Sequence, residues 1–259
     1  MNNKNIRLNK LVAILKDNKS ISVKELSQIL EVSEMTIRRD LDLLKSNDIV
    51  HRSYGKATYV ENSAHDASND DYELHYEQNI MNSEKDKIGK YAAGLIEAGD
   101  VLILDTGTTT DNLAKHISEG LGITVLCYNF NILAQLIRKH DIKLIFGGGY
   151  FHPKDQIFES PQGINLIENI RATKMFVSTS GIHQKLGLTC SQTYEVLTKR
   201  TALQSAQTKI LVADSSKFGK VRTAYFAQLN EIDEIITDSG LSAEWKDIII
   251  SMNINLHIV

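Results

Sequence analysis

The sequence predicts a two-domain chain, in which a small helical domain precedes a larger domain of the α/β class. Three observations support this expectation. Residues 1–60 are basic, with 11 lysines and arginines against 7 aspartates and glutamates, whereas the remaining residues hold 18 and 25. Continuous apolar runs alternate with helical patterns from about residue 83 onwards, and a polar, acidic stretch separates the two parts. We therefore expect an amino-terminal domain at 1–60, a linker at 61–80 and a carboxy-terminal domain at 81–259.

The amino-terminal domain begins with two predicted helices. Residues 5–17 carry apolar side chains at helical spacing, which predicts a helix with one buried face. In the stretch SVKELSQIL, Ser22 is followed three residues later by Glu25. This spacing is typical of a capping box, which satisfies two backbone N–H groups at the start of a helix. The apolar residues of this second helix are expected to be buried: Val23, Leu26, Ile29 and Leu30.

A third predicted helix runs from Ser33 to Leu44 and completes a helix-turn-helix. Ile37, Leu41 and Leu44 recur at helical spacing and are expected to face the core, which leaves the paired arginines outside. An α-helix fits the major groove of DNA, and arginine can bond guanine edges or phosphates. We therefore expect DNA contacts from Ser33, Met35, Thr36, Arg38 and Arg39. The alternative is that Arg38 forms only a surface pair with Glu34 or Asp42.

A β-hairpin is predicted after the third helix. Ile49–Ser53 and Lys56–Val60 are β-prone runs on either side of Tyr54 and Gly55. Such a hairpin would form a wing beside the helix-turn-helix. Arg52 and Lys56 on the wing are expected to contact the DNA backbone and to add salt-dependent affinity.

The carboxy-terminal domain is expected to contain a buried, mainly parallel sheet with helices on both faces. Its helical patterns are EKDKIGKYAAGLIEAG, TDNLAKHIS and ILAQLIRKH. The strand-like runs are VLILD, ITVLCYN, IKLIFGGG, KMFVSTSG, KILVADSS, EIITD and NLHIV. Continuous apolar strands that alternate with helices are typical of this architecture.

Polar residues follow several of these strands, where ligands bind in such folds. In DTGTTT, Gly107 permits a tight turn, and Thr108 and Thr109 open a helix whose N–H groups favour a phosphate. Asp105 offers an acceptor for sugar hydroxyls, and Lys217 offers a cation for phosphate. The alternatives are a capped strand–helix turn and a surface pair of Lys217 with Asp214. Further candidate ligand contacts follow other strands: Asn129, Gly147 and Gly148.

These stretches also resemble a known family. VSEMTIRRDL with a wing after it resembles the winged-helix domain of the DeoR family of bacterial sugar-metabolism repressors. EKDKIGKYAAGLI, DTGTTT and VADSSKFG resemble the family's effector domain, which is similar to ribose-5-phosphate isomerase in fold and senses phosphorylated sugars. The resemblance covers nearly the whole chain. It implies a repressor of a sugar or deoxyribonucleoside catabolic operon that a phosphorylated sugar releases from double-stranded operator DNA.

The resemblance also suggests an effector and an assembly. CYNFN and SKFGKVR are similar to stretches of a family member that responds to deoxyribose-5-phosphate, so this sugar is the expected effector. Because each subunit would read one half-site, a homo-oligomer is expected.

Two other functions remain open: a sugar-phosphate isomerase-like enzyme, and a transcriptional activator with the same effector domain. The histidines form no triad, so no catalytic residue is predicted. Cys127 and Cys190 lie far apart and form no metal-ligand pattern, so no metal site is expected. No cofactor is expected either. No apolar run reaches the ~20 residues that a membrane span needs, and a cytoplasmic protein is expected.

Overall fold

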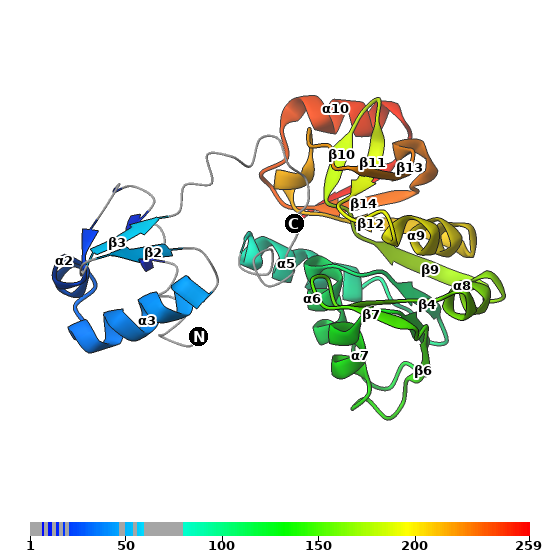
Figure 1. Cartoon of the computed structure of the whole chain (residues 1–259). Coiled ribbons are helices and arrows are strands. Elements are labelled where there is room, and N and C mark those ends of the chain that lie inside the picture. Colours follow the sequence, from blue (N-terminus) through cyan, green and yellow to red (C-terminus); the bar gives the residue numbers. More distant parts are fainter. Residues whose placement is uncertain are drawn as a thin grey trace. The chain divides into compact units, whose positions relative to one another are not determined.

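The computed structural model divides the chain into two compact units, Met1–Ser68 and Asn69–Val259 (Figure 1). The structure describes Arg7, Lys10, Leu11, Ile14, Leu15, Asn18 and residues 21–46, 50–53, 56–59 and 80–259. The predicted linker at 61–80 lies outside this part of the chain except for Ile80. Within the described residues, no helix has the length and apolar character to cross a membrane.

The amino-terminal domain contains the predicted helix-turn-helix and wing. Its helices are α2 (Val23–Ile29) and α3 (Glu34–Ser46). In the segment 5–17, which is predicted to be a helix, the structure describes five residues, and all are helical: Arg7, Lys10, Leu11, Ile14 and Leu15. The other residues of this segment lie outside the described part of the chain. Strand β2 (Val50–Ser53) pairs with β3 (Lys56–Tyr59), as the wing prediction requires, although its turn at 54–55 is not described. An additional strand, β1 (Ile21–Ser22), pairs with β3 and was not predicted.

The helix signals of the amino-terminal domain are confirmed with one exception. The capping box is present: Ser22 Oγ accepts from the Glu25 N–H at 3.2 Å, and Glu25 Oε2 accepts from the Ser22 N–H at 2.9 Å. Ile29 was expected to be buried but is 55% exposed. It lies roughly 90° around the helix from the stripe that Val23 and Leu26 form, because successive residues advance about 100°. The core of this domain consists of Leu11, Leu15, Ile21, Val23, Leu26, Ile37, Leu41, Leu44 and Ala57.

A seven-stranded parallel sheet forms the centre of the carboxy-terminal domain, as predicted. The strand order is β15-β14-β12-β9-β4-β5-β6. Every neighbouring pair in this sheet is parallel. The strands are β4 (Val101–Leu104), β5 (Thr124–Cys127), β6 (Lys143–Phe146), β9 (Ala172–Val177), β12 (Ala206–Val212), β14 (Glu234–Thr237) and β15 (Asn255–Ile258).

Helices cover both faces of the sheet (Figure 1). On β4, Leu102 and Leu104 pack in one core cluster and Ile103 in the other, because alternate side chains point to opposite faces. One face is covered by α5 (Asn82–Ala93), α6 (Thr108–His116) and α7 (Phe130–Leu136). The other is covered by α8 (Pro161–Glu168), α9 (Glu195–Gln204) and α10 (Ala243–Ser251). The helix predicted from residue 84 ends earlier than expected, at Ala93, with Gly94 as its C-cap.

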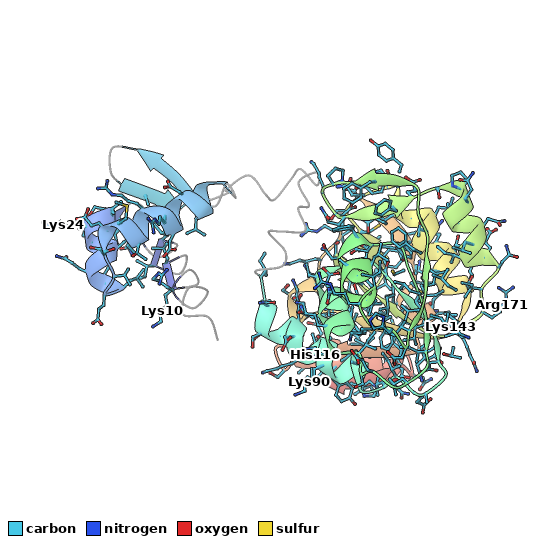
Figure 2. The ribbon with its side chains drawn as sticks, turned by 90° about the horizontal axis from the view of Figure 1, so that it is seen from below. Lys10, Lys24, Lys90, His116, Lys143 and Arg171 are labelled. Atoms are coloured by element: carbon cyan, nitrogen blue, oxygen red, sulfur yellow. The ribbon has the colours of Figure 1, made fainter. Side chains whose placement is uncertain are left out.

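Helices α5 and α6 lie against each other on the first of these faces. His116 Nε2 of α6 is 2.8 Å from Asp86 Oδ1 of α5. Figure 2 labels His116 of α6 and Lys90 of α5.

Short elements that the sequence did not predict lie in the chain between strands of the central sheet. They are the antiparallel hairpin β7 (Tyr150–His152) and β8 (Ile157–Glu159), a three-stranded sheet of β10 (Gly181–His183), β11 (Gly187–Cys190) and β13 (Ala224–Ala227), and the 3₁₀ turns η1 (Ser215–Lys217) and η2 (Leu229–Glu231). The loop between β7 and β8 brings Asp155, and η1 brings Lys217, to the carboxyl edge of the sheet.

Candidate functional site

Helix α3 presents its arginines to solvent, as predicted. Ile37 and Leu41 are fully buried, whereas Met35 is 61% exposed and both Arg38 and Arg39 are exposed. The next residue, Asp40, points inward and accepts hydrogen bonds from Arg7 Nε at 2.6 Å and Nη2 at 3.3 Å. The hydrogen bond to Asp40 raises the pKa of Arg7. Sequence reasoning missed this anchor, which fixes the orientation of α3 so that its two arginines face outward.

The amino end of α3 is held by Ser33. Its Oγ accepts from the Thr36 N–H at 3.2 Å and lies 2.9 Å from Thr36 Oγ1. Arg38 Nη2 is 3.3 Å from Glu34 Oε2, so the surface pair considered from the sequence is also present. Exposed pairs of this kind contribute about 0–1 kcal/mol and can exchange for a phosphate contact.

Of the remaining predicted DNA contacts, the structure describes the side chain of Arg39 but not those of Arg52 and Lys56. Arg39 makes no hydrogen bond or ion pair with any described residue, so its guanidinium group can reach a partner in solution. Arg52 lies on β2 and Lys56 on β3, but the side chains of both fall outside the described part of the chain. Lys24 of α2 also projects into solvent from this domain (Figure 2).

A cavity lies at the carboxyl ends of β4, β9 and β12, and we call it the sheet-end cavity. It brings together four of the predicted effector contacts, Gly107, Thr108, Thr109 and Lys217. The other lining residues are Thr106, Asp155, Ser178, Thr179, Ser180, Glu195, Lys199 and Ala213. The enclosed volume is about 20 Å³, which is room for about one water molecule.

The amino end of α6 opens into this cavity. Gly107 has φ of 151°, and a Cβ atom there would lie 2.5 Å from Ser178 Oγ, so this position requires glycine. The hydroxyls of Thr108 and Thr109 make no hydrogen bond with any described residue. The first N–H groups of an α-helix have no partner within the helix and attract anions. The arrangement therefore suits an anionic oxygen group.

Two predicted ligand contacts lie behind the cavity wall instead of lining it. Asp105 is fully buried, and its carboxylate accepts from Tyr128 Oη at 2.5 Å and from the Ser178 N–H at 2.9 Å. Asn129 is also fully buried; its Oδ1 caps α7, and its Nδ2 donates to Thr106 Oγ1 at 2.8 Å. Both side chains therefore hold the loop that carries Gly107.

The glycine run after β6 also lies apart from the lining residues, since neither Gly147 nor Gly148 is among them. The third glycine of the run, Gly149, shows a structural reason for glycine at this place. Gly149 has φ of 143°, and a Cβ atom there would lie 2.2 Å from the carbonyl oxygen of Glu159. The run thus allows β7 to pass close to β8.

Three charged residues of the cavity were missed by sequence reasoning: Asp155, Glu195 and Lys199. Lys199 Nζ lies 2.5 Å from Asp105 Oδ2 and 3.7 Å from Glu195 Oε2. Burial lowers the pKa of Lys199, but the charges of Asp105 and Glu195 outweigh it and raise the value to about 12. Burial raises the pKa of Glu195 to about 7. Because Glu195 and Lys199 are four residues apart on one helix, the sequence alone is typical of an ordinary surface pair.

Comparison with known proteins gives matches over both domains. Residues 7–63 match the profile described as "DeoR-like helix-turn-helix domain". Residues 80–239 match the profile described as "DeoR C terminal sensor domain". The chain belongs to the DeoR family.

Individual DeoR-family relatives align over most of the chain. The uncharacterized HTH-type transcriptional regulator YulB of Bacillus subtilis is 33% identical over 91% of this chain and 89% of its own. The deoxyribose operon repressor of Escherichia coli is 32% identical over 90% of this chain and 89% of its own. Among solved structures, ribose 5-phosphate isomerase A of Methanocaldococcus jannaschii is similar over 53% of this chain and 55% of its own, with 14% identity and a TM-score of 0.39. These last values are too low to support an inference about function.

A buried ion pair connects the cavity of this DeoR-type sensor domain to α5. Lys85 of α5 lies 3.8 Å from Asp214, and both side chains are at most 1% exposed. Asp214 also caps η1, because its Oδ1 accepts from the Ser216 N–H at 3.0 Å. Lys217, which lines the cavity, is the last residue of η1. A movement of η1 would therefore act on α5 through this pair.

Proposed function

We propose that this DeoR-family protein is a transcriptional repressor of a sugar or deoxyribonucleoside catabolic operon. In this proposal, α3 binds operator DNA, and a phosphorylated sugar in the sheet-end cavity releases the protein from it. The observation that carries the proposal is the amino end of α6, where two threonines and Lys217 line one cavity. The name of the Escherichia coli relative supports deoxyribose-5-phosphate as the first effector to test.

DNA binding rests on the outer face of α3. Arg38 and Arg39 extend from a helix whose opposite face is packed, so both guanidinium groups can enter a groove without disturbing the core. The wing residues Arg52 and Lys56 complete the proposed contact surface through the DNA backbone. A homo-oligomer would place two such surfaces on repeated half-sites.

Release requires the effector to prefer a conformation that binds DNA poorly. In the present conformation, the cavity has room for about one water molecule, so we expect a bound sugar phosphate to move parts of the lining apart. If η1 moves, the contact between Asp214 and Lys85 transmits the change to α5. Helix α5 is the first described helix after the linker, so it is the natural route toward the amino-terminal domain.

The experiment that tests the DNA part measures fluorescence anisotropy of a labelled duplex that the full chain has selected from a random pool. Arg39→Ala should weaken binding by about 10-fold, which corresponds to the loss of one base or phosphate contact. Arg138→Ala is the matched control, because Arg138 is an exposed arginine of the carboxy-terminal domain. Equal effects of the two substitutions would contradict DNA binding by α3.

One observation favours a second candidate function, an isomerase-like enzyme. Glu195 is a buried carboxyl group in the cavity with a pKa of about 7, which is suited to general acid–base catalysis near neutral pH. Incubation of the full chain with ribose-5-phosphate and deoxyribose-5-phosphate distinguishes the two. Turnover that Glu195→Gln abolishes would support the enzyme; the repressor proposal expects binding without turnover. An activator would share the same contacts and would differ in its effect on transcription.

A further inference from the structure

The loop between β7 and β8 places one buried carboxyl group in the wall of the sheet-end cavity. Asp155 is 1% exposed and lines the cavity. Its Oδ2 accepts a hydrogen bond from Tyr194 Oη at 2.8 Å. Its Oδ1 is buried and has no hydrogen-bond partner among the described residues. Since a buried acceptor without a partner is costly, this atom indicates a hydrogen bond that a ligand supplies.

Hydrogen bonds and ring contacts hold the loop that carries Asp155, and backbone N–H groups of Asp155 and Ile157 lie near its carboxyl group and lower its pKa against the larger effect of burial. Its backbone carbonyl accepts from Asn129 Nδ2 at 3.1 Å. The ring of Tyr194 stacks on His152 with ring centroids 3.7 Å apart and planes 10° from parallel. His152 Nε2 in turn lies 3.0 Å from Glu159 Oε2. The loop, the tyrosine and the hairpin therefore hold the carboxyl group at a fixed position.

The charges in the cavity decide which ligand group can face Asp155. Glu195, Lys199 and Lys217 line the same cavity, so it holds two buried carboxyl groups and two cations. Lys199 Nζ already lies 2.5 Å from Asp105 Oδ2 and 3.7 Å from Glu195 Oε2. Burial raises the pKa of both carboxyl groups, Asp155 and Glu195. A carboxylate on the ligand would bring a third acidic group into the same buried space, whereas a hydroxyl would donate to Oδ1 without adding charge. The phosphate of the ligand would lie at the amino end of α6, beside Gly107, Thr108 and Thr109.

We propose that Asp155 is a specificity-determining residue whose Oδ1 accepts a hydrogen bond from a ligand hydroxyl. The cavity then takes phosphate esters of hydroxylated sugars and excludes phosphate esters that end in a carboxylate. Tyr194 is a positioning residue that holds Oδ2 and thereby orients Oδ1. This inference rests on the proposed function, because it assumes a phosphorylated ligand at the amino end of α6.

Calorimetric titration of the full chain tests this role with three probes: deoxyribose-5-phosphate, 3-phosphoglycerate and inorganic phosphate. The wild type should bind the sugar phosphate more tightly than the other two. Asp155→Asn should weaken sugar phosphate binding by about 10-fold and change inorganic phosphate binding by less than about 2-fold. The same substitution should strengthen binding of 3-phosphoglycerate, because it removes a negative charge. Asp247→Asn, at an exposed aspartate of α10, is the matched control and should change nothing.

Tyr194→Phe provides a second variant that keeps the ring stacked on His152. It should lower the ratio of sugar phosphate affinity to inorganic phosphate affinity, although less than Asp155→Asn does. Fluorescence of Trp245, the single tryptophan, verifies that each variant is folded. A loss shared equally by the sugar phosphate and inorganic phosphate in both variants would overturn the role of Asp155.

The controls also separate this inference from the proposed function. If the wild type binds none of the three phosphorylated probes, the proposed function fails and the role of Asp155 fails with it. If the wild type binds the sugar phosphate and Asp155→Asn leaves the affinity ratio unchanged, only the role of Asp155 is lost.

Discussion

Replacement of Lys199 by methionine removes the cation from a fully buried ionic group. Lys199 Nζ is 2.5 Å from Asp105 Oδ2, and the two side chains are 1% and 0% exposed. Breaking a buried pair by removing one partner costs about 3–5 kcal/mol, because the other charge stays buried. Asp105 would keep its hydrogen bonds from Tyr128 and Ser178, so we expect the lower end, about 3 kcal/mol. Methionine retains most of the lysine volume, which keeps packing losses small.

Urea unfolding of the full chain measures this cost. Trp245 on α10 is the single tryptophan, so its fluorescence follows the carboxy-terminal domain. The control is Lys174→Met. Lys174 Nζ is 2.7 Å from Asp100 Oδ2, but its side chain is 17% exposed, so water can solvate part of the charge and this substitution should cost less than Lys199→Met.

The double variant Asp105→Asn/Lys199→Met should be more stable than the sum of the two single effects predicts. Asparagine needs no cation, so the second substitution should cost little once the first is made. The interpretation is contradicted if Lys199→Met costs less than about 1 kcal/mol or if the two costs simply add.

Two further predictions concern the same cavity. Because the pKa of Glu195 is raised to about 7, the folded state binds more protons than the unfolded state between about pH 4.3 and 7, and stability falls as pH rises through this window. In urea unfolding at several pH values, the free energy of unfolding of the wild type should fall by about 3 kcal/mol across this window, and Glu195→Gln should abolish this fall. The same fall in both proteins would contradict the prediction. Gly107→Ala should destabilise by about 1–3 kcal/mol, because its Cβ would meet Ser178 Oγ, whereas Gly99→Ala, with φ of 80° and open space, should cost about 1 kcal/mol. Equal costs in thermal unfolding would contradict the contact.

Most strands of the central sheet could be predicted because they contain a continuous apolar run, such as VLIL in β4. Buried parallel strands carry this signal within a few consecutive residues. The short elements around the cavity carry no such signal. Strand β10, for example, is the three-residue stretch Gly-Ile-His, and it forms because β11 pairs with it. Pairing of this kind depends on tertiary contacts.

The candidate site could be predicted only where a local motif specifies it. DTGTTT identified Gly107, Thr108 and Thr109, since a glycine turn before a helix is a local feature. The same motif made Asp105 look like a ligand contact. Its partner Lys199 lies 94 positions later in the chain, and no local pattern indicates that the two meet. Asp155 was missed for the same reason, because its role depends on the hairpin and on Tyr194.

The proposal that a sugar phosphate regulates DNA binding is tested most directly by the fluorescence anisotropy of a labelled operator duplex during titration with deoxyribose-5-phosphate. For the wild type, the sugar phosphate should weaken DNA binding by at least about 10-fold, since typical coupling between two sites is about 1–3 kcal/mol. For Lys217→Ala, the duplex should bind with unchanged affinity and should stay bound when the sugar phosphate is added. A wild-type complex that stays intact at a sugar phosphate concentration that raises the unfolding temperature of the protein would contradict control of DNA binding by the cavity.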